Sequence, residues 1–344
     1  MPVASWTNGL EDIIGSEIVT DFGIKGKNIL ITGGTGSFGK KCVEALIRKG
    51  PPDRLVVFSR DELKQYEMSQ QINHPAIRFF IGDVRDKERL YRAMDGVDAV
   101  IHAAALKQVP ACEYNPFEAV KTNIIGAVNV IDAAIDRGVK RVIAVSTDKA
   151  VSPINLYGAT KLCAEKLFVQ GNIYSGYNPT IFSCARYGNV FASRGSVVQL
   201  FMHQKSTGVI TITDRRMTRF WITLDQGVDF VIRSLQNMQG GEIFIPKIPS
   251  MSVTDLAEAL APGCDIKITG IRPGEKIHEL LVSPDESRNT LEFPDMFIVK
   301  PPENVINWKN PKGNEGKELP DGFSYGSDNN TDWLTVAQIR DMVG

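Results

Sequence analysis

The chain has 344 residues, of which 43% are hydrophobic and 23% are charged. This length predicts one large domain, or one domain with a second lobe. Thirty-nine Lys and Arg residues against 40 Asp and Glu residues exclude a broad basic surface for nucleic acid or an anionic membrane.

Cysteines and histidines are few and scattered. The five cysteines include no CxxC pair, and the four histidines are isolated. This spacing predicts neither a disulfide framework nor a metal site. No apolar run approaches the ~20 residues of a membrane span, and the N-terminus lacks the pattern of a signal peptide. We therefore expect a cytoplasmic protein with no membrane partner.

The first half of the chain alternates apolar strands and helices, after an N-terminal extension of residues 1–25. Near-continuous apolar strands separated by helices predict a parallel sheet with both faces covered. Right-handed crossovers then give a doubly wound, Rossmann-type α/β fold over residues 26–186. The expected strands are 28–32, 55–58, 78–81, 99–102, 141–146 and 180–184, and the expected helices include 40–49 and 118–137.

Beyond residue 187 the alternation is less regular. Residues 187–300 are expected to form mainly a smaller, mixed α/β substrate-binding lobe, with later segments returning to the first domain. Its expected strands are 209–213, 242–245 and 266–269, and its expected helices are 224–237 and 253–260. Residues 301–344 are interpreted as an exposed connector (301–320) and a C-terminal segment that docks back through Trp333 and residues 335–343.

A glycine-rich loop follows the first expected strand and opens the first helix. Glycines permit a tight turn and a close approach of the backbone to a pyrophosphate, which the amide groups of a helix N-terminus then bind. The alternative is a plain structural turn. The predicted dinucleotide-binding residues here are Gly33, Thr35, Gly36, Ser37, Phe38 and Gly39.

The end of the second strand bears on the choice between NAD and NADP. It carries Ser59 and Arg60, and Asp61 comes slightly late for a contact to the ribose 2′-hydroxyl. Arg60 and Lys64 suit a 2′-phosphate, so we expect NADP; alternatively they are a solvated helix start. Further predicted cofactor contacts at strand ends are Asp83, Val84, Ala103, Ala104 and Ala105.

Two short motifs of polar residues follow the fifth expected strand. Tyr157 and Lys161 are four residues apart at a helix start, which places them on one face. A nearby ammonium is expected to lower the tyrosine pKa from about 10, so that the pair accepts a proton from a sugar hydroxyl. Thr147-Asp148-Lys149 lies at the strand tip one segment earlier. An exposed Tyr and a salt-bridged turn are the alternative readings.

With these residues in view, the chain resembles extended short-chain dehydrogenases/reductases. Within them it is most similar to the inverting UDP-N-acetylglucosamine 4,6-dehydratases that begin pseudaminic acid synthesis. The resemblance covers roughly residues 25–343. It rests on ILITGGTGSFGKK, VVFSRDELKQ, RFFIGDVRD, IHAAALKQVP, STDKAVSPINLYGATK, RYGNVFASRGSVV, TDRRMTRFWIT, GEIFIPKIPSM, GIRPGEKIHE and GFSYGSDNNTDWL. It implies a homo-oligomer, from dimer to hexamer, and a product used to modify flagellin or surface glycans.

The implied reaction oxidises C4 of the sugar, which makes the C5 hydrogen acidic, expels the C6 hydroxyl as water and returns the hydride to C6. Tyr157, helped by Lys161, is expected to take the C4 hydroxyl proton, and Thr147 to hydrogen-bond the C4 oxygen. Dehydratases of this family that retain the C5 configuration carry Asp-Glu where this chain has Asp148-Lys149. We assign Asp148 as acid and Lys149 as base, which requires burial or Lys161 to lower the pKa of Lys149.

The resemblance also supplies the remaining contacts. Additional cofactor residues are Lys107, Thr122, Tyr187, Asn189 and Val190, besides Tyr157 and Lys161. UDP-N-acetylglucosamine is expected to contact Lys107, Asn189, Arg194, Val197, Thr211, Arg219, Arg272 and Glu275. His102 is interpreted as a packing residue. The alternatives are a dehydratase or C4 epimerase for another nucleotide sugar, and a non-catalytic NADP-binding sensor.

Overall fold

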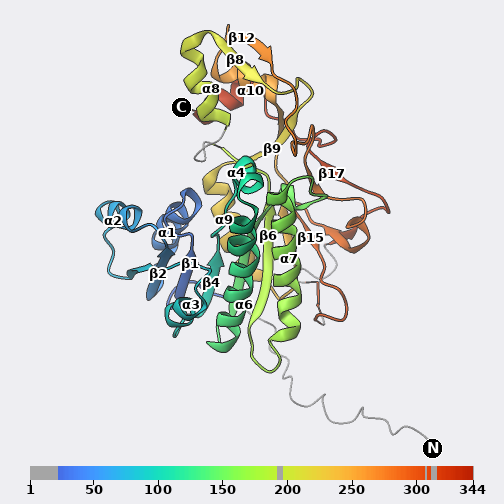
Figure 1. Cartoon of the computed structure of the whole chain (residues 1–344). Helices are drawn as coiled ribbons and strands as arrows, with labels where there is room; N and C mark the ends of the chain where they lie inside the picture. Colours follow the sequence, from blue (N-terminus) through green and yellow to red (C-terminus); the bar gives the residue numbers. More distant parts are fainter. Residues whose placement is uncertain (1–21, 192–196, 307, 311–315, 344) are drawn as a thin grey trace, which may run out of the picture.

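A computed structural model describes residues 22–191, 197–306, 308–310 and 316–343. The described residues form a large sheet covered by helices, with a smaller lobe at one end of it (Figure 1). The first half contains the elements β1 (Asn28–Thr32), α1 (Ser37–Lys49), β2 (Arg54–Ser59), α2 (Glu62–Gln71), β3 (Ile77–Ile81), α3 (Lys87–Ala93), β4 (Ala99–His102), α4 (Val109–Tyr114), α5 (Pro116–Val120), α6 (Gly126–Asp136), β5 (Arg141–Thr147), α7 (Leu156–Tyr174) and β6 (Ile181–Tyr187).

The order of the parallel strands is that of a doubly wound sheet. The strands from β3 to β6 run β3-β2-β1-β4-β5-β6, and every neighbouring pair is parallel. Helix α1 packs against α9 (Leu224–Asn237), whereas α3, α6 and α7 pack side by side. The predicted Rossmann-type α/β class is therefore confirmed. The strand centres are fully buried, as both-face coverage requires.

Later segments extend this sheet beyond β6. Strand β10 (Ile243–Pro246) pairs parallel to β6, and β15 (Met296–Val299) pairs antiparallel to β10. The expected strand at 242–245 therefore lies in the large sheet rather than in the smaller lobe. Within the expected exposed connector, β16 (Lys317–Glu318) pairs with β14 (Thr290–Glu292) at the sheet edge. A strand of two exposed residues cannot be predicted from the sequence, because it is too short to show an alternation of apolar and polar residues.

The smaller lobe has its own apolar core. It contains α8 (Val197–Gln204), β8 (Val209–Ile212), α10 (Val253–Leu260), β12 (Asp265–Ile268) and α11 (Val336–Val343), grouped at the top of Figure 1. Helix α11 packs on α10, and Trp333 forms a β-bridge with Ser250. The elements linking lobe and sheet are β7 (Asn189–Val190), β9 (Thr218–Ile222), β11 (Ser250–Ser252), β13 (Leu280–Val282) and β17 (Tyr325–Gly326).

The helix expected at 118–137 is interrupted. A π-helical turn, Lys121–Ile125, separates α5 from α6. Inside it, Asn123 accepts a hydrogen bond from the Leu106 amide at 2.8 Å and donates to the Leu106 carbonyl at 2.9 Å. Such turns occur frequently at functional sites. This one places Thr122 on the wall of the main cavity.

Candidate active site

A cavity of about 910 Å³ opens where the carboxyl ends of the parallel strands face the smaller lobe. Ligands of doubly wound sheets bind at this edge. The predicted residues on its wall are Gly33, Thr35, Gly36, Ser37, Phe38, Gly39, Ser59, Arg60, Asp61, Lys64, Asp83, Val84, Ala103, Ala104, Ala105, Lys107, Thr122, Thr147, Lys149, Tyr157, Lys161, Tyr187, Asn189, Val190, Val197, Thr211, Arg219, Arg272 and Glu275. Asp148 does not reach the wall, and Arg194 lies outside the described residues.

The glycine loop is shaped for close backbone approach. Gly33 has φ +67°, and a Cβ there would lie 2.9 Å from the Ala104 amide nitrogen. A Cβ on Gly39 would lie 2.5 Å from the Cα of Gly34, so the helix start packs directly on the loop. Gly36 caps α1 without any side-chain hydrogen bond to the first-turn amides. These amides suit a pyrophosphate, so the loop fits the predicted dinucleotide.

The end of β2 carries both signs of charge. Asp61 caps α2 by accepting a hydrogen bond from the Lys64 amide at 3.0 Å, and its carboxylate also pairs with the Lys64 ammonium. The Arg60 side chain is half exposed, with its guanidinium 3.5 Å from the Asp83 carboxylate. Arg60 is therefore the cation here with most freedom to turn towards a ligand in the cavity.

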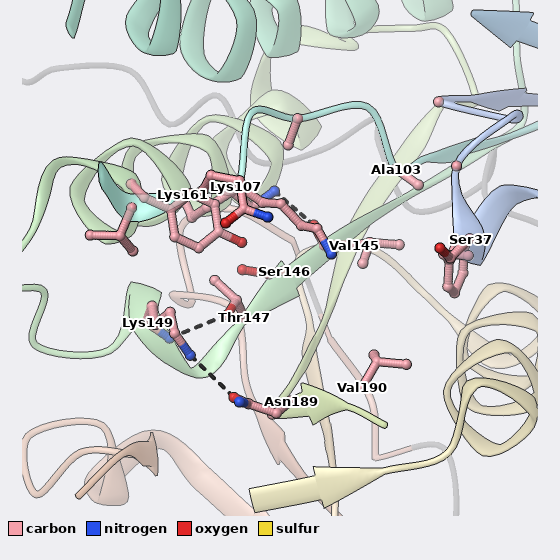
Figure 2. A pocket seen from close by; sticks show the side chains of 18 of the residues that line it. Ser37, Ala103, Lys107, Val145, Ser146, Thr147, Lys149, Lys161, Asn189 and Val190 are labelled. Carbon is pink, nitrogen blue, oxygen red and sulfur yellow. Dashed lines mark hydrogen bonds between the residues drawn. The ribbon is translucent and has the colours of Figure 1, made fainter. Parts of the chain in front are cut away.

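At the tip of β5, one carboxylate oxygen organises three consecutive residues. Oδ1 of Asp148 accepts hydrogen bonds from the Thr147 hydroxyl and from the Lys149 ammonium, each at 2.9 Å. Asp148 is fully buried, and its Oδ2 has no hydrogen-bond partner among the described residues. Thr147 and Lys149 do line the cavity (Figure 2). Asp148 is thus connected to the cavity through its two sequence neighbours, Thr147 and Lys149, which hydrogen-bond to it and line the cavity.

Lys149 lies among several acceptors. Besides Asp148, its Nζ is 3.5 Å from Oε1 of Glu279 and donates to Oδ1 of Asn189 at 3.3 Å, the latter drawn in Figure 2. Burial acts to lower the pKa of Lys149, but the negative charges of Asp148 and Glu279 outweigh it and hold this pKa above its ordinary value. The prediction that burial or Lys161 depresses the pKa of Lys149 is therefore wrong for this structure.

Tyr157 and Lys161 lie on the first turns of α7, which Asn155 caps by accepting from the Gly158 amide at 2.8 Å. Burial raises the pKa of Tyr157 to about 12, and the charge of Lys149 and a hydrogen bond with Thr147 oppose that rise. The Lys161 ammonium donates instead to the Val145 carbonyl at 2.7 Å (Figure 2). The expectation that Lys161 lowers the pKa of Tyr157 is thus wrong here; Lys149 exerts that influence.

Arg219 was predicted to grip the substrate, but its guanidinium already has partners. It donates to the carbonyls of Thr218, Ile277 and Lys276 at 2.7, 2.9 and 2.9 Å. Its side chain is only 10% exposed. These hydrogen bonds hold the segment around Ile277 against β9. Direct phosphate binding by Arg219 stays a prediction.

Sequence reasoning missed Glu279 and Lys276. Glu279 is buried on the cavity wall beside Lys149, and Lys276 Nζ donates to the Val151 carbonyl at 2.6 Å. Both belong to GIRPGEKIHE, one of the stretches behind the resemblance. Only the fold brings this stretch to β5, so no local spacing identifies the pair.

His102 is buried at the end of β4. Its Nδ1 lies 2.8 Å from the Thr32 hydroxyl and its ring packs against Phe168. The predicted packing role is confirmed. Elsewhere in the described residues, no group of three or more His, Cys, Asp or Glu side chains is placed to hold a metal ion. None of the helices described here combines the length and apolarity of a bilayer-spanning segment.

Comparison with known proteins identifies the relatives of the chain. A family model described as polysaccharide biosynthesis protein matches residues 29–301. A UDP-N-acetylglucosamine 4,6-dehydratase (inverting) of Campylobacter jejuni subsp. jejuni serotype O:23/36 (strain 81-176) is 54% identical over 325 residues, covering 92% of this chain and 97% of the relative. A UDP-glucose 4-epimerase of Rickettsia conorii is 44% identical over 281 residues, covering 79% and 82%.

The solved structure of Pen from Bacillus thuringiensis is similar throughout. It has a TM-score of 0.85 and 40% sequence identity, with 93% of this chain and 98% of the other covered. The resemblance to inverting UDP-N-acetylglucosamine 4,6-dehydratases that the motifs indicate is confirmed by the 54% identity. The chain belongs to the polysaccharide biosynthesis protein family.

Proposed function

We propose that this protein is a UDP-N-acetylglucosamine 4,6-dehydratase that inverts C5. The observation that carries the proposal is that Thr147, Lys149 and Tyr157 line the same cavity as the glycine loop. The 54% identity to a dehydratase of that name supports it. The product would be UDP-2-acetamido-2,6-dideoxy-β-L-arabino-hex-4-ulose, as required for the first step of pseudaminic acid synthesis.

We further propose NADP as the cofactor. When bound, a nicotinamide ring supplies an acceptor and later a donor for hydride. The first-turn amides of α1, which Gly36 does not cap with a side chain, suit the pyrophosphate, and the half-exposed guanidinium of Arg60 suits a 2′-phosphate. Asp61 is tied to Lys64 and to the start of α2, which makes it a poor acceptor for a ribose hydroxyl.

The side chains divide the proton transfers between them. Tyr157 takes the proton of the C4 hydroxyl when it is in its phenolate form, which the charge of Lys149 favours and burial opposes, and Thr147 hydrogen-bonds the C4 oxygen. Lys149 takes the C5 proton, and C5 later regains a proton on its opposite face, which inverts its configuration. A proton of Asp148 protonates the leaving C6 hydroxyl, reaching the cavity through Thr147 or Lys149, because both are hydrogen-bonded to Oδ1 of Asp148. Thr147, Asp148 and Tyr157 are buried and Lys149 is partly buried, which strengthens their mutual electrostatic interactions.

The second candidate is C4 epimerisation, which the 44% identity to a UDP-glucose 4-epimerase favours. Epimerisation needs a base at the C4 hydroxyl but neither an acid at C6 nor a base at C5. Asp148 and Lys149 would then have no chemical role, although Asp148 is a fully buried carboxylate, one oxygen of which has no hydrogen-bond partner in the described part of the chain. Keeping such a group is costly unless it serves a purpose. We therefore prefer dehydration.

Incubation with a panel of UDP- and dTDP-sugars, followed by mass spectrometry, tests the proposal. We expect UDP-N-acetylglucosamine to lose the mass of one water, with catalytic NADP and no external oxidant. Isomerisation without a mass change would establish the epimerase. Tight binding of UDP-N-acetylglucosamine without conversion would instead support a non-catalytic NADP-binding sensor.

We also propose a homo-oligomer. Tyr114 at the end of α4 and Phe117 in α5 are 88% and 77% exposed. Exposed large apolar side chains that lie within four residues of each other are compatible with a subunit contact, and the resemblance implies self-association. Light scattering coupled to size-exclusion chromatography should give a multiple of 37.9 kDa, which the double substitution Tyr114→Ser and Phe117→Ser should reduce.

A further inference from the structure

Glu279 lies beside the proposed base, although it comes from a distant part of the chain. It immediately precedes β13, and its side chain is 4% exposed. Its Oε1 is 3.5 Å from the Lys149 ammonium and 3.9 Å from Nε of Arg219. Its Oε2 is 3.7 Å from Lys276 and has no hydrogen-bond partner among the described residues. A buried carboxylate in this position interacts strongly with the charge on Lys149.

The backbone of Glu279 is fixed independently of the β5 tip. Its amide donates to the Ser327 hydroxyl at 2.9 Å, and the Ser327 amide donates to the Glu279 carbonyl at 2.8 Å. Ser327 is fully buried and also hydrogen-bonds to Thr218 of β9. The carboxylate is therefore held at a set place, as a residue that orients another side chain must be.

Several charged or titratable groups face or influence Lys149 from the surrounding elements. Asp148 and Glu279 are the two carboxylates whose charges favour its ammonium, and Arg219 opposes them. The charge on Lys149 in turn influences three further groups, which are Lys107, Lys276 and Tyr157. Removing one carboxylate would leave three cations around Lys149 with Asp148 alone opposing them.

We propose that Glu279 is a positioning residue for Lys149: it orients the Lys149 side chain and biases the proton shared by Asp148 and Lys149 towards the lysine. This inference rests on the proposed dehydratase function. Before C5 is attacked, the Lys149 ammonium passes a proton to Oδ1 of Asp148, leaving a neutral amine and a carboxylic acid. The amine then takes the C5 proton while the C–H electron pair forms the enolate, and the acid proton leaves with the C6 hydroxyl as water.

The substitution Glu279→Gln tests this with almost no change of shape. We expect the acid limb of the kcat/KM profile to move to lower pH by about 1 unit, because one of two carboxylates facing the base is lost. KM should stay within about twofold. The control Glu292→Gln removes a carboxylate paired with Lys247 outside the cavity and should leave the profile unchanged. A tenfold rise in KM with an unmoved limb would overturn the proposal by assigning Glu279 to substrate binding.

Glu279→Asp keeps the charge but withdraws it from Lys149. Glu279→Asp should move the acid limb of the kcat/KM profile to lower pH, but by a smaller amount than Glu279→Gln. It also provides the test if Glu279→Gln does not fold. A merely structural Glu279 would lower the melting temperature in both variants and leave the limb in place, which contradicts the proposal.

A measurement without turnover separates this inference from the proposed function. Lysine side chains labelled with ¹⁵N are titrated by NMR, with Lys149 assigned by its disappearance in Lys149→Met. Lys149 should titrate about 1 unit lower in Glu279→Gln than in the wild type. Equal titration in a folded variant overturns the inference. Failure of the wild type to dehydrate UDP-N-acetylglucosamine would refute the function and leave this coupling measurable.

Discussion

The Thr147 hydroxyl donates a hydrogen bond to Oδ1 of Asp148 at 2.9 Å, and of these two residues only Thr147 lines the cavity. The carboxylate is buried behind the hydroxyl, so its proton has no direct path to a sugar in this conformation. Two residues adjacent in sequence thus occupy successive positions on a proton route. For the proposed reaction, a proton held by Asp148 would reach the cavity through Thr147 only after this hydrogen bond, in which Thr147 is now the donor, reverses its direction.

Asp148→Asn should block water loss. The amide keeps the shape but cannot supply the acidic proton, so we expect dehydration to fall by about 100-fold or more. Mass spectrometry of the nucleotide sugar measures this directly. Asp285→Asn, an exposed substitution outside the cavity, is the control. Near-normal water loss by the Asp148 variant would remove Asp148 from the mechanism.

Tyr157→Phe should abolish turnover and preserve cofactor binding. The phenol oxygen is the proposed base at C4, and its ring packs with Cys112 and Ala119, which phenylalanine can maintain. We expect turnover to drop by at least about 100-fold, with the dissociation constant of NADP unchanged in calorimetry. A variant that loses NADP binding and activity together would indicate a structural role for the phenol.

Arg60→Ala should weaken NADP binding selectively. If the guanidinium binds the 2′-phosphate, its loss should raise the dissociation constant of NADP about 10-fold or more, since hydrogen bonds to charged groups contribute ~1.5–3 kcal/mol. The dissociation constant of NAD should hardly change. Arg48→Ala, an exposed change outside the cavity, controls for net charge. Equal weakening for both dinucleotides would contradict the NADP assignment.

His102 should make the folded state sensitive to acid. Burial lowers the pKa of His102 to about 3, whereas the unfolded chain titrates near 6.5. The unfolded state therefore binds more protons between these values. Neutral, buried His102 contributes to the free energy of unfolding above pH ~6.5. This contribution is lost as the pH falls towards 3, at about 1.4 kcal/mol per pH unit. Urea unfolding at pH 7 and pH 5 should show a smaller difference for His102→Gln than for the wild type; an equal difference would argue against this assignment.

Much of the fold follows from local patterns in the sequence. The apolar runs around Leu30, Val56 and Val100 predicted parallel strands, because burial on both faces demands continuous apolar sequence. The π-helical turn Lys121–Ile125 was missed, since its cause is a tertiary contact between Asn123 and the backbone of Leu106. Strand β10 was expected in the smaller lobe but pairs with β6 in the large sheet, because a short apolar run does not specify its neighbour.

The site was predictable where a motif is local. The glycine loop and the turns carrying Thr147 and Tyr157 are contiguous, and the fold gathers them around one cavity. The electrostatics were not predictable, because they depend on residues brought in from the smaller lobe and the C-terminal half. Asp148 and Glu279 together reverse the expected direction of the Lys149 pKa shift, and of these two only Asp148 is a sequence neighbour of Lys149. The backbone partners of Arg219 are likewise visible only in three dimensions.

The central claim is that Lys149 removes the C5 hydrogen and that C5 then takes a solvent-derived proton on the opposite face. Running the reaction on UDP-N-acetylglucosamine in deuterated water and solving the product by NMR tests it most directly. We predict one deuterium at C5 with inverted configuration. A product that retains the C5 configuration, or that carries hydrogen rather than deuterium at C5, would contradict the role given to Lys149.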